Sequence, residues 1–187
     1  MKKKITLLLS LVLAVAMGIG GTLAWLTAKT EAVKNTFTVG NIDIDLTETT
    51  TNYKMVPGQT IDKDPKVTVE AGSEACWLFV KIEKGNDLDK FIDYAVADGW
   101  TALTGVDGVY YREVAADATN RSFEVIGYES GNPAEFTANK VLVKDSVTKD
   151  DMDGLTADNY PTLTFTAYAI QRASFDDPAA AWTEASK

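Results

Sequence analysis

The stretch TLTFTAYAIQ, residues 162–171, decides the fold class of this chain. Its side chains divide between two faces: Leu163, Phe165, Ala167 and Ala169 on one, and Thr164, Thr166, Tyr168 and Ile170 on the other. Strict alternation over several residues is typical of a β-strand, in which successive side chains point to opposite faces. The sequence therefore predicts a long strand at Thr162–Gln171.

A second stretch, Ala75–Glu83, also alternates, and it is apolar on both faces at first. One face carries Leu78, Val80 and Ile82, and the other carries Trp77, Phe79 and Lys81. A strand that is apolar on both faces is usually covered on both. We therefore expect this strand to lie centrally, between a core and a covering loop.

Shorter apolar runs between glycine, proline and asparagine turn signals predict further strands. Their ranges are Ile42–Leu46, Val67–Glu70, Gly108–Val114, Ser122–Tyr128 and Lys140–Lys144. Short helices are predicted at Asp87–Ala97, with Leu88, Phe91 and Ile92 inward, and at Pro178–Ala185, where Asp176 and Asp177 form an N-cap region. This pattern favours an all-β domain at residues 35–187, an antiparallel jelly roll or β-sandwich with one or two short helices.

The first 24 residues have the pattern of a signal peptide. Lys2–Lys4 form a positive segment, Ile5–Ile19 form an apolar segment, and Gly18, Gly20 and Gly21 then interrupt it. Thr22 and Ala24 supply the small side chains that a signal peptidase accepts, which predicts cleavage between Ala24 and Trp25. The alternative is an uncleaved membrane anchor, but the apolar run is shorter than the roughly 20 residues that span a bilayer.

Charge and composition narrow the classes of function. The formal charge is −9, and because residues 1–24 contain three lysines and no acidic residue, their removal leaves −12. Such a domain repels phosphate groups, so nucleic acid is not an expected partner and membrane contact is expected only transiently, through the signal peptide. The chain has no histidine and a single cysteine, Cys76, which excludes an intramolecular disulfide and the commonest zinc ligand. No cofactor and no metal site are expected.

The N-terminal region resembles a known family. The segments GGTLAWLT at residues 20–27 and NTFTVGNIDIDL at residues 35–46 are similar to the start of the TasA/camelysin-like matrix proteins, which a SipW-type signal peptidase processes. Leu26 stands where an aromatic residue is usual, and Ala28 where an aspartate is common. The resemblance implies a secreted jelly-roll domain, often polymerised by donor-strand exchange into fibres that hold a biofilm together.

Residues 25–34 form an N-terminal arm without an evident place in their own domain. Its apolar residues do not alternate cleanly; they are Trp25, Leu26, Ala28, Ala32 and Val33. An extended arm can add to the open sheet edge of a neighbouring subunit, and repeated head-to-tail this contact gives a fibre. We therefore interpret these residues as a donor strand.

Three other patterns suggest chemistry but have simpler interpretations. Ser146-Val147-Thr148-Lys149 matches the bare S-x-x-K pattern without its partner motifs and is interpreted as coincidence. The acidic residues Asp150, Asp151, Asp153 and Asp158 form either a solvated loop or a weak calcium site, although their order does not fit an EF-hand. Trp25, Trp77, Trp100 and Trp182 are interpreted as core or interface anchors rather than as a carbohydrate platform, and Cys76 as a buried inert thiol.

Together these observations predict a secreted, non-enzymatic structural subunit of an extracellular matrix or surface fibre. Its expected partners are other copies of itself, a SipW-type signal peptidase and an accessory matrix protein. The alternative from another class is a monomeric surface module that binds carbohydrate or a host protein. A third interpretation is the metallopeptidase activity that the camelysin name implies, which the absence of histidine disfavours.

Overall fold

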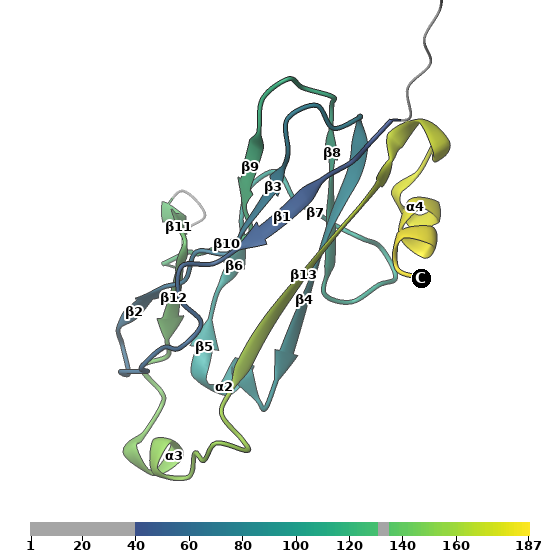
Figure 1. Cartoon of the computed structure of the whole chain (residues 1–187). Coiled ribbons are helices and arrows are strands. Elements are labelled where there is room, and N and C mark those ends of the chain that lie inside the picture. Colours follow the sequence, from purple (N-terminus) through teal and green to yellow (C-terminus); the bar gives the residue numbers. More distant parts are fainter. Residues whose placement is uncertain (1–39, 131–134) are drawn as a thin grey trace, which may run out of the picture. The chain divides into compact units, whose positions relative to one another are not determined.

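A computed structural model describes residues 40–130 and 135–187 of the chain. These residues form an antiparallel β-rich domain in which four sheets make two layers (Figure 1). One layer is the four-stranded sheet β13-β4-β8-β7, and the other consists of the three-stranded sheets β1-β3-β9, β11-β10-β6 and β2-β12-β5. The predicted all-β sandwich is thus confirmed.

The strands are mostly short, as befits a sandwich of this size. Their bounds are Ile44–Thr47 (β1), Thr60–Asp62 (β2), Lys66–Val69 (β3), Cys76–Gly85 (β4), Ile92–Asp93 (β5), Ala95–Val96 (β6), Thr101–Ala102 (β7), Val109–Val114 (β8), Arg121–Glu124 (β9), Ile126–Tyr128 (β10), Thr137–Ala138 (β11), Lys140–Val143 (β12) and Thr162–Gln171 (β13). The helices are Leu88–Phe91 (α2), Lys149–Asp153 (α3) and Pro178–Ala185 (α4), with a 3₁₀ turn at Arg172–Ser174 (η2).

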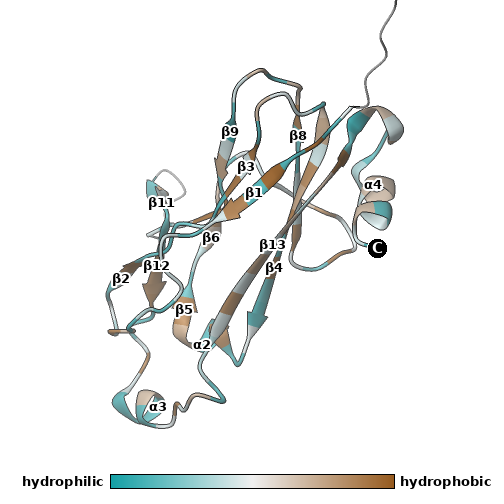
Figure 2. Cartoon of the chain, in the orientation of Figure 1, coloured by the Kyte–Doolittle hydropathy of each residue, from teal (hydrophilic) through white to brown (hydrophobic). Residues whose placement is uncertain are grey.

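The two longest strands, β4 and β13, pair along their whole length and organise the domain. Their register places Phe165 beside Ile82, Ala167 beside Val80 and Ala169 beside Leu78. These side chains face the main core, where the valines and isoleucines of the opposite layer meet them. Figure 2 shows the hydrophobic colour on β1, β3 and β12 across from this sheet, with polar colour in the loops.

The other face of β4 is covered as well. Trp77 and Phe79 are 6% and 0% exposed and pack with Ala181 and Trp182 of α4. The Phe79 and Trp182 ring centroids lie 5.4 Å apart. The predicted central position of the strand is therefore confirmed, but its cover is mainly a helix rather than a loop alone.

Helix α4 begins where the sequence predicts. The Asp177 side chain accepts hydrogen bonds from the backbone N–H groups of Ala179 and Ala180, at 2.9 and 3.1 Å. Pro178 stands in the first turn, where its missing N–H costs nothing. These two features fix the entry of the helix that closes the outer face of β4.

The predicted helix at Asp87–Ala97 is wrong in extent. Only α2 is helical, and β5 and β6 follow it directly. Ile92 pairs with Val143 and Val96 with Ile126, so sheet pairing of β-branched residues overrides the helical spacing. Leu88, Phe91 and Ile92 do point inward, as expected, with exposures of 4%, 4% and 7%.

The predicted strand at Ser122–Tyr128 is divided in two. Val125 separates β9 from β10, is fully buried, and donates its backbone N–H to the Pro65 carbonyl at 3.1 Å. The chain therefore passes from the β1-β3-β9 sheet to the β11-β10-β6 sheet at this residue. A strand that changes sheets in this way still reads as one apolar run in the sequence.

Candidate functional site

The residues predicted to be cleaved or to form the assembly arm lie outside the described residues. They are Ala24, Trp25, Leu26, Ala28, Ala32 and Val33. The surfaces that could receive such an arm, however, belong to the described domain.

Among the strands that lie at the edges of the four sheets, β1 and β13 are two that face each other in residues 40–130 and 135–187. β13 pairs with β4 on one side only, and β1 pairs with β3 on one side only. The two strands also approach each other closely without pairing (Figure 1). Unpaired edges present rows of backbone N–H and C=O groups that an added strand can satisfy.

The side chains beside these edges suit an apolar guest. Ile44 and Leu46 of β1 and Leu163 and Phe165 of β13 are only partly buried, and all four pack against the main core. An extended segment placed at either edge would therefore meet both free backbone groups and apolar contacts. We regard this pair of strands as the candidate assembly site.

Cys76 and the described tryptophans lie in or against the hydrophobic clusters of the domain. Cys76 is fully buried in β4, and burial raises the pKa of its thiol to about 11. Trp77 and Trp182 pack in the cluster under α4, and the Trp100 indole donates to the Glu124 carbonyl at 2.8 Å. These three tryptophans thus serve packing, as expected, while Trp25 lies outside the described residues.

Of the acidic cluster after β12, Asp150, Asp151 and Asp153 lie in helix α3 rather than in the loop that the sequence suggests, and Asp158 lies beyond it. Thr148 caps α3, because its side chain accepts from the Asp151 N–H while the Asp151 carboxylate accepts from the Thr148 N–H at 3.0 Å. Lys90 lies 2.6 Å from the other carboxylate oxygen. Hydrogen bonding to Lys90 and Thr148 holds the pKa of Asp151 far below its usual value.

This capping accounts for the chemistry-like patterns in the same segment. Thr148 is the N-cap, Lys149 pairs with Asp153, and Ser146 is exposed, so the S-x-x-K residues serve the helix start. The sequence does contain the capping signal, a threonine three residues before an acidic residue. The high density of charge in this segment nevertheless favours a loop when the sequence is considered alone.

A metal site needs several side chains with suitable donor atoms close together. In residues 40–130 and 135–187 there is no group of three or more aspartate, glutamate, histidine or cysteine side chains that could hold a metal ion. The chain as a whole has no histidine, and its one thiol is buried in the core. The donors present therefore do not fit a catalytic zinc site, which normally needs three good ligands.

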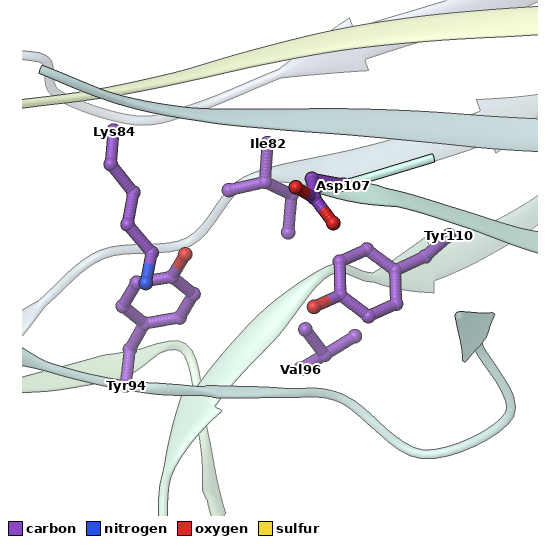
Figure 3. A pocket seen from close by; sticks show the side chains of 7 residues that line it. Ile82, Lys84, Tyr94, Val96, Asp107 and Tyr110 are labelled. Atoms are coloured by element: carbon purple, nitrogen blue, oxygen red, sulfur yellow. The ribbon is translucent and has the colours of Figure 1, made fainter. Parts of the chain in front are cut away.

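A hollow of about 470 Å³ lies beside β4 and β8 (Figure 3). Its lining residues are Ile82, Lys84, Tyr94, Val96, Asp107, Gly108 and Tyr110. The Lys84 ammonium lies 5.4 Å from the centre of the Tyr94 ring and 2.8 Å from Asp89. Burial, with smaller contributions from Tyr110 and Asp89, raises the pKa of Tyr94 to about 12, so Tyr94 keeps its hydroxyl proton at neutral pH.

Gly108 lets the turn before β8 approach β4 closely at this hollow. Its backbone has φ of +71°, and a side chain there would meet the Ile82 carbonyl at 2.5 Å. Aromatic rings with hydroxyl, ammonium and carboxylate groups around a small concavity can bind a small polar molecule. The sequence gives no sign of this arrangement, because its residues come from three separate segments.

The N-terminal part of the chain matches a known family model. The family model described as camelysin metallo-endopeptidase matches residues 1–75. Residues 1–75 are thus similar to the TasA/camelysin-like family. The match ends just before β4, so most of the described domain lies beyond it. No curated protein and no solved structure matches the chain.

Within the part of the chain that the structure describes, no helix has both the length and the apolar character required to cross a bilayer.

Proposed function

We propose that this camelysin-like protein is a secreted structural subunit of an extracellular matrix or surface fibre. The observation that carries the proposal is the pair of unpaired strand edges on β1 and β13. The family match supports it at the N-terminus, where the processing and arm motifs lie. Subunits would join head-to-tail, with residues 25–34 of one added to an open edge of the next.

Backbone hydrogen bonds would hold an added strand at the free edge of β13. β13 is ten residues long, so an added strand could form a ladder of comparable length. An open edge of this length is otherwise a liability, because it invites uncontrolled association. In a head-to-tail contact the arm of one subunit binds an edge of the next. If the subunits do not close into a ring, repetition of this contact gives a filament.

Processing would control when the contact forms. Before cleavage after Ala24, the signal peptide would hold the arm at the membrane. A SipW-type signal peptidase would release it outside the cell, where neighbouring subunits are available. The −12 charge of the remaining chain would keep unassembled subunits apart.

The family description names a metallo-endopeptidase, and we propose that this chain lacks that activity. Zinc-dependent hydrolysis requires a set of protein ligands and a general base. The donors of this chain are carboxylates and one buried thiol, which do not form such a set among the described residues.

The second candidate function is a monomeric surface module that binds carbohydrate or a host protein. The hollow lined by Lys84, Tyr94, Asp107 and Tyr110 favours it, because tyrosine rings and polar groups together suit sugars. The two candidates differ in what the processed protein does alone in solution.

Electron microscopy of the processed protein at neutral pH tests the proposal. Filaments with a regular subunit repeat are expected. A protein that stays monomeric at high concentration, with or without an accessory matrix protein from the same cells, would contradict it and favour the binding module.

A further inference from the structure

Arg112 occupies a position of β8 that otherwise faces the core. It pairs with Leu78 in the register of β4 and β8, and the neighbouring pairs on that face are Val80 with Tyr110 and Cys76 with Val114. Leu78, Val80, Cys76 and Val114 are all buried in the main core. A guanidinium group on this face needs an explanation, because burying a charge without a partner is costly.

Aromatic rings contact the guanidinium, and none of the carboxylates in residues 40–130 and 135–187 forms an ion pair with it. The Arg112 Cζ atom lies 3.8 Å from the centre of the Phe123 ring and 5.3 Å from that of Trp100. Its Nε is buried and has no hydrogen-bond partner within the described residues. The other two arginines of the chain do pair with acids: Arg121 with Asp117 and Arg172 with Glu113.

The backbone beside Arg112 is shaped to leave room for it. Gly99 has φ of +83°, a conformation that favours glycine. A Cβ atom at this position would lie 3.0 Å from Nη2 of Arg112. The turn between β6 and β7 thus accommodates the guanidinium.

Next to Arg112 is a hollow of about 510 Å³, separate from the one in Figure 3. Charged groups of both signs line it: Lys66 and Arg112, and Asp98 and Glu124. Neither cation forms an ion pair with a described carboxylate, although both acids line the same hollow. The space between them is of the size that small ligands fill in proteins.

We propose that this hollow binds the carboxylate group of a small molecule, an acidic monosaccharide or an amino acid, through the guanidinium of Arg112. Guanidinium and carboxylate groups match as planar, two-pronged partners. Contact with Phe123 covers a face of the guanidinium and leaves its N–H edge for a ligand. Asp98 and Glu124 can accept hydrogen bonds from hydroxyl or ammonium groups of the same molecule.

The surroundings of Arg112 disfavour its positive charge. Burial, with a contribution from Arg121, lowers the pKa of Arg112, which means that the surroundings disfavour the positive charge. A bound carboxylate would reverse that effect. The proposal is independent of fibre assembly, because the hollow and the strand edges of β1 and β13 involve different residues.

Titration followed by nuclear magnetic resonance tests the proposal on the protein in its processed form. The probes are sodium glucuronate, alanine and, as the neutral comparison, glucose. Glucuronate or alanine should shift the Trp100 indole N–H and the Phe123 amide, with an affinity in the millimolar range or tighter, while glucose should not. Shifts by glucuronate alone identify a sugar acid, and shifts by alanine alone identify an amino acid.

Matched variants separate recognition from packing. Arg112→Met should weaken binding about tenfold or more, because it removes a charged hydrogen-bonding partner. Arg112→Lys keeps the charge without the fork and should also weaken it. Arg172→Met is the control, since Arg172 also stacks on a tryptophan, Trp77, at 4.5 Å, but on the opposite face of the sheet. It should bind like the unaltered protein.

Several results would overturn the proposal. The unaltered protein showing no shift at Trp100 or Phe123 with either carboxylate would do so without any variant. So would glucose binding as tightly as glucuronate, or full affinity in Arg112→Lys. If Arg112→Met does not fold, Arg112→Lys and the unaltered protein still decide the question.

Discussion

The ammonium group of Lys63 lies 2.6 Å from Oε1 of Glu48, and both side chains are nearly removed from water, at 9% and 16% exposure. The Tyr53 hydroxyl donates to the same carboxylate oxygen at 2.7 Å. Lys63 also lies 4.9 Å from the centre of the Tyr53 ring and 5.2 Å from that of Phe165. One buried charge thus joins the loop after β1 to strand β13.

Glu48→Gln should destabilise the fold by about 2 to 3 kcal/mol, because Lys63 would keep a buried charge without its counter-ion. Urea unfolding measures the effect. The control is Glu83→Gln, which removes the exposed partner of Lys81 and should change stability by less than about 0.5 kcal/mol. Equal costs for the two variants would show that burial of Lys63 is not what matters.

The capping box of α3 should make stability depend on pH in the acid range. Asp151 has a folded-state pKa below its ordinary value of 3.8, so its ionised form stabilises the fold above that pH. The contribution is lost as pH falls through the lower folded value. The melting-temperature difference between the unaltered protein and Asp151→Asn should stay constant down to about pH 5 and then shrink below about pH 4.

The neighbouring Asp158→Asn provides the comparison, because Asp158 takes no part in the capping box. A difference for Asp151→Asn that persists unchanged in acid would mean that its carboxylate charge does not stabilise α3.

Secreted protein should begin at Trp25, because Thr22 and Ala24 provide the small residues that a signal peptidase accepts. Intact mass and N-terminal sequencing of protein from the culture medium check this. Replacing Ala24 with a bulky residue, Ala24→Leu, should leave unprocessed chain in the membrane fraction. Unaltered protein that retains residues 1–23 would instead indicate a membrane-anchored protein.

Removal of zinc with a selective chelator should change neither fold nor assembly, and the purified protein should not cleave casein. The reason is the donor set of the chain, which has no histidine and only one, buried, thiol. Stoichiometric zinc in the purified protein, together with casein cleavage that the chelator stops, would establish the peptidase. A modest stabilisation by calcium is compatible with the expectation, because residues 150–158 include four exposed or half-buried carboxylates.

A chain that starts at Asn35 should fold and remain monomeric, because it lacks the arm but keeps the domain. Trp25→Ala in the processed chain should weaken polymerisation without lowering the unfolding temperature. Light scattering follows assembly, and circular dichroism checks the fold. If the chain from Asn35 forms ordinary filaments, the arm is not the donor, and the contact must involve the faces of the sheets.

The sequence predicts the long strands well because their own pattern suffices. The predicted bounds of β13 and α4 agree with the structure, and the two faces of β4 are as expected. Alternation and a proline after an acidic cap are local signals, and nothing in the tertiary structure competes with them.

The rest depends on contacts that are distant in sequence. Ile92 and Val96 have helical spacing relative to Leu88, yet they extend because β12 and β10 are available to pair with them. The same is true of the hollow beside Arg112, whose walls come from β3, β8, β9 and the turn after β6. In the sequence Arg112 is only one charged residue in an alternating strand, and its lack of a partner becomes visible only when its neighbours are in place.

The pairing of β4 with β13 also bears on the order of events during synthesis. Gly85 pairs with Thr162 and Cys76 with Gln171, so β4 lacks this one of its two neighbours until residue 171 has been made, although β8 is made earlier. Helix α4, which covers Trp77 and Phe79, is completed later still. Long-range pairing of this kind delays folding, because the intervening chain must first be ordered. The pairing that organises the domain therefore cannot form while the chain is still being elongated through β13.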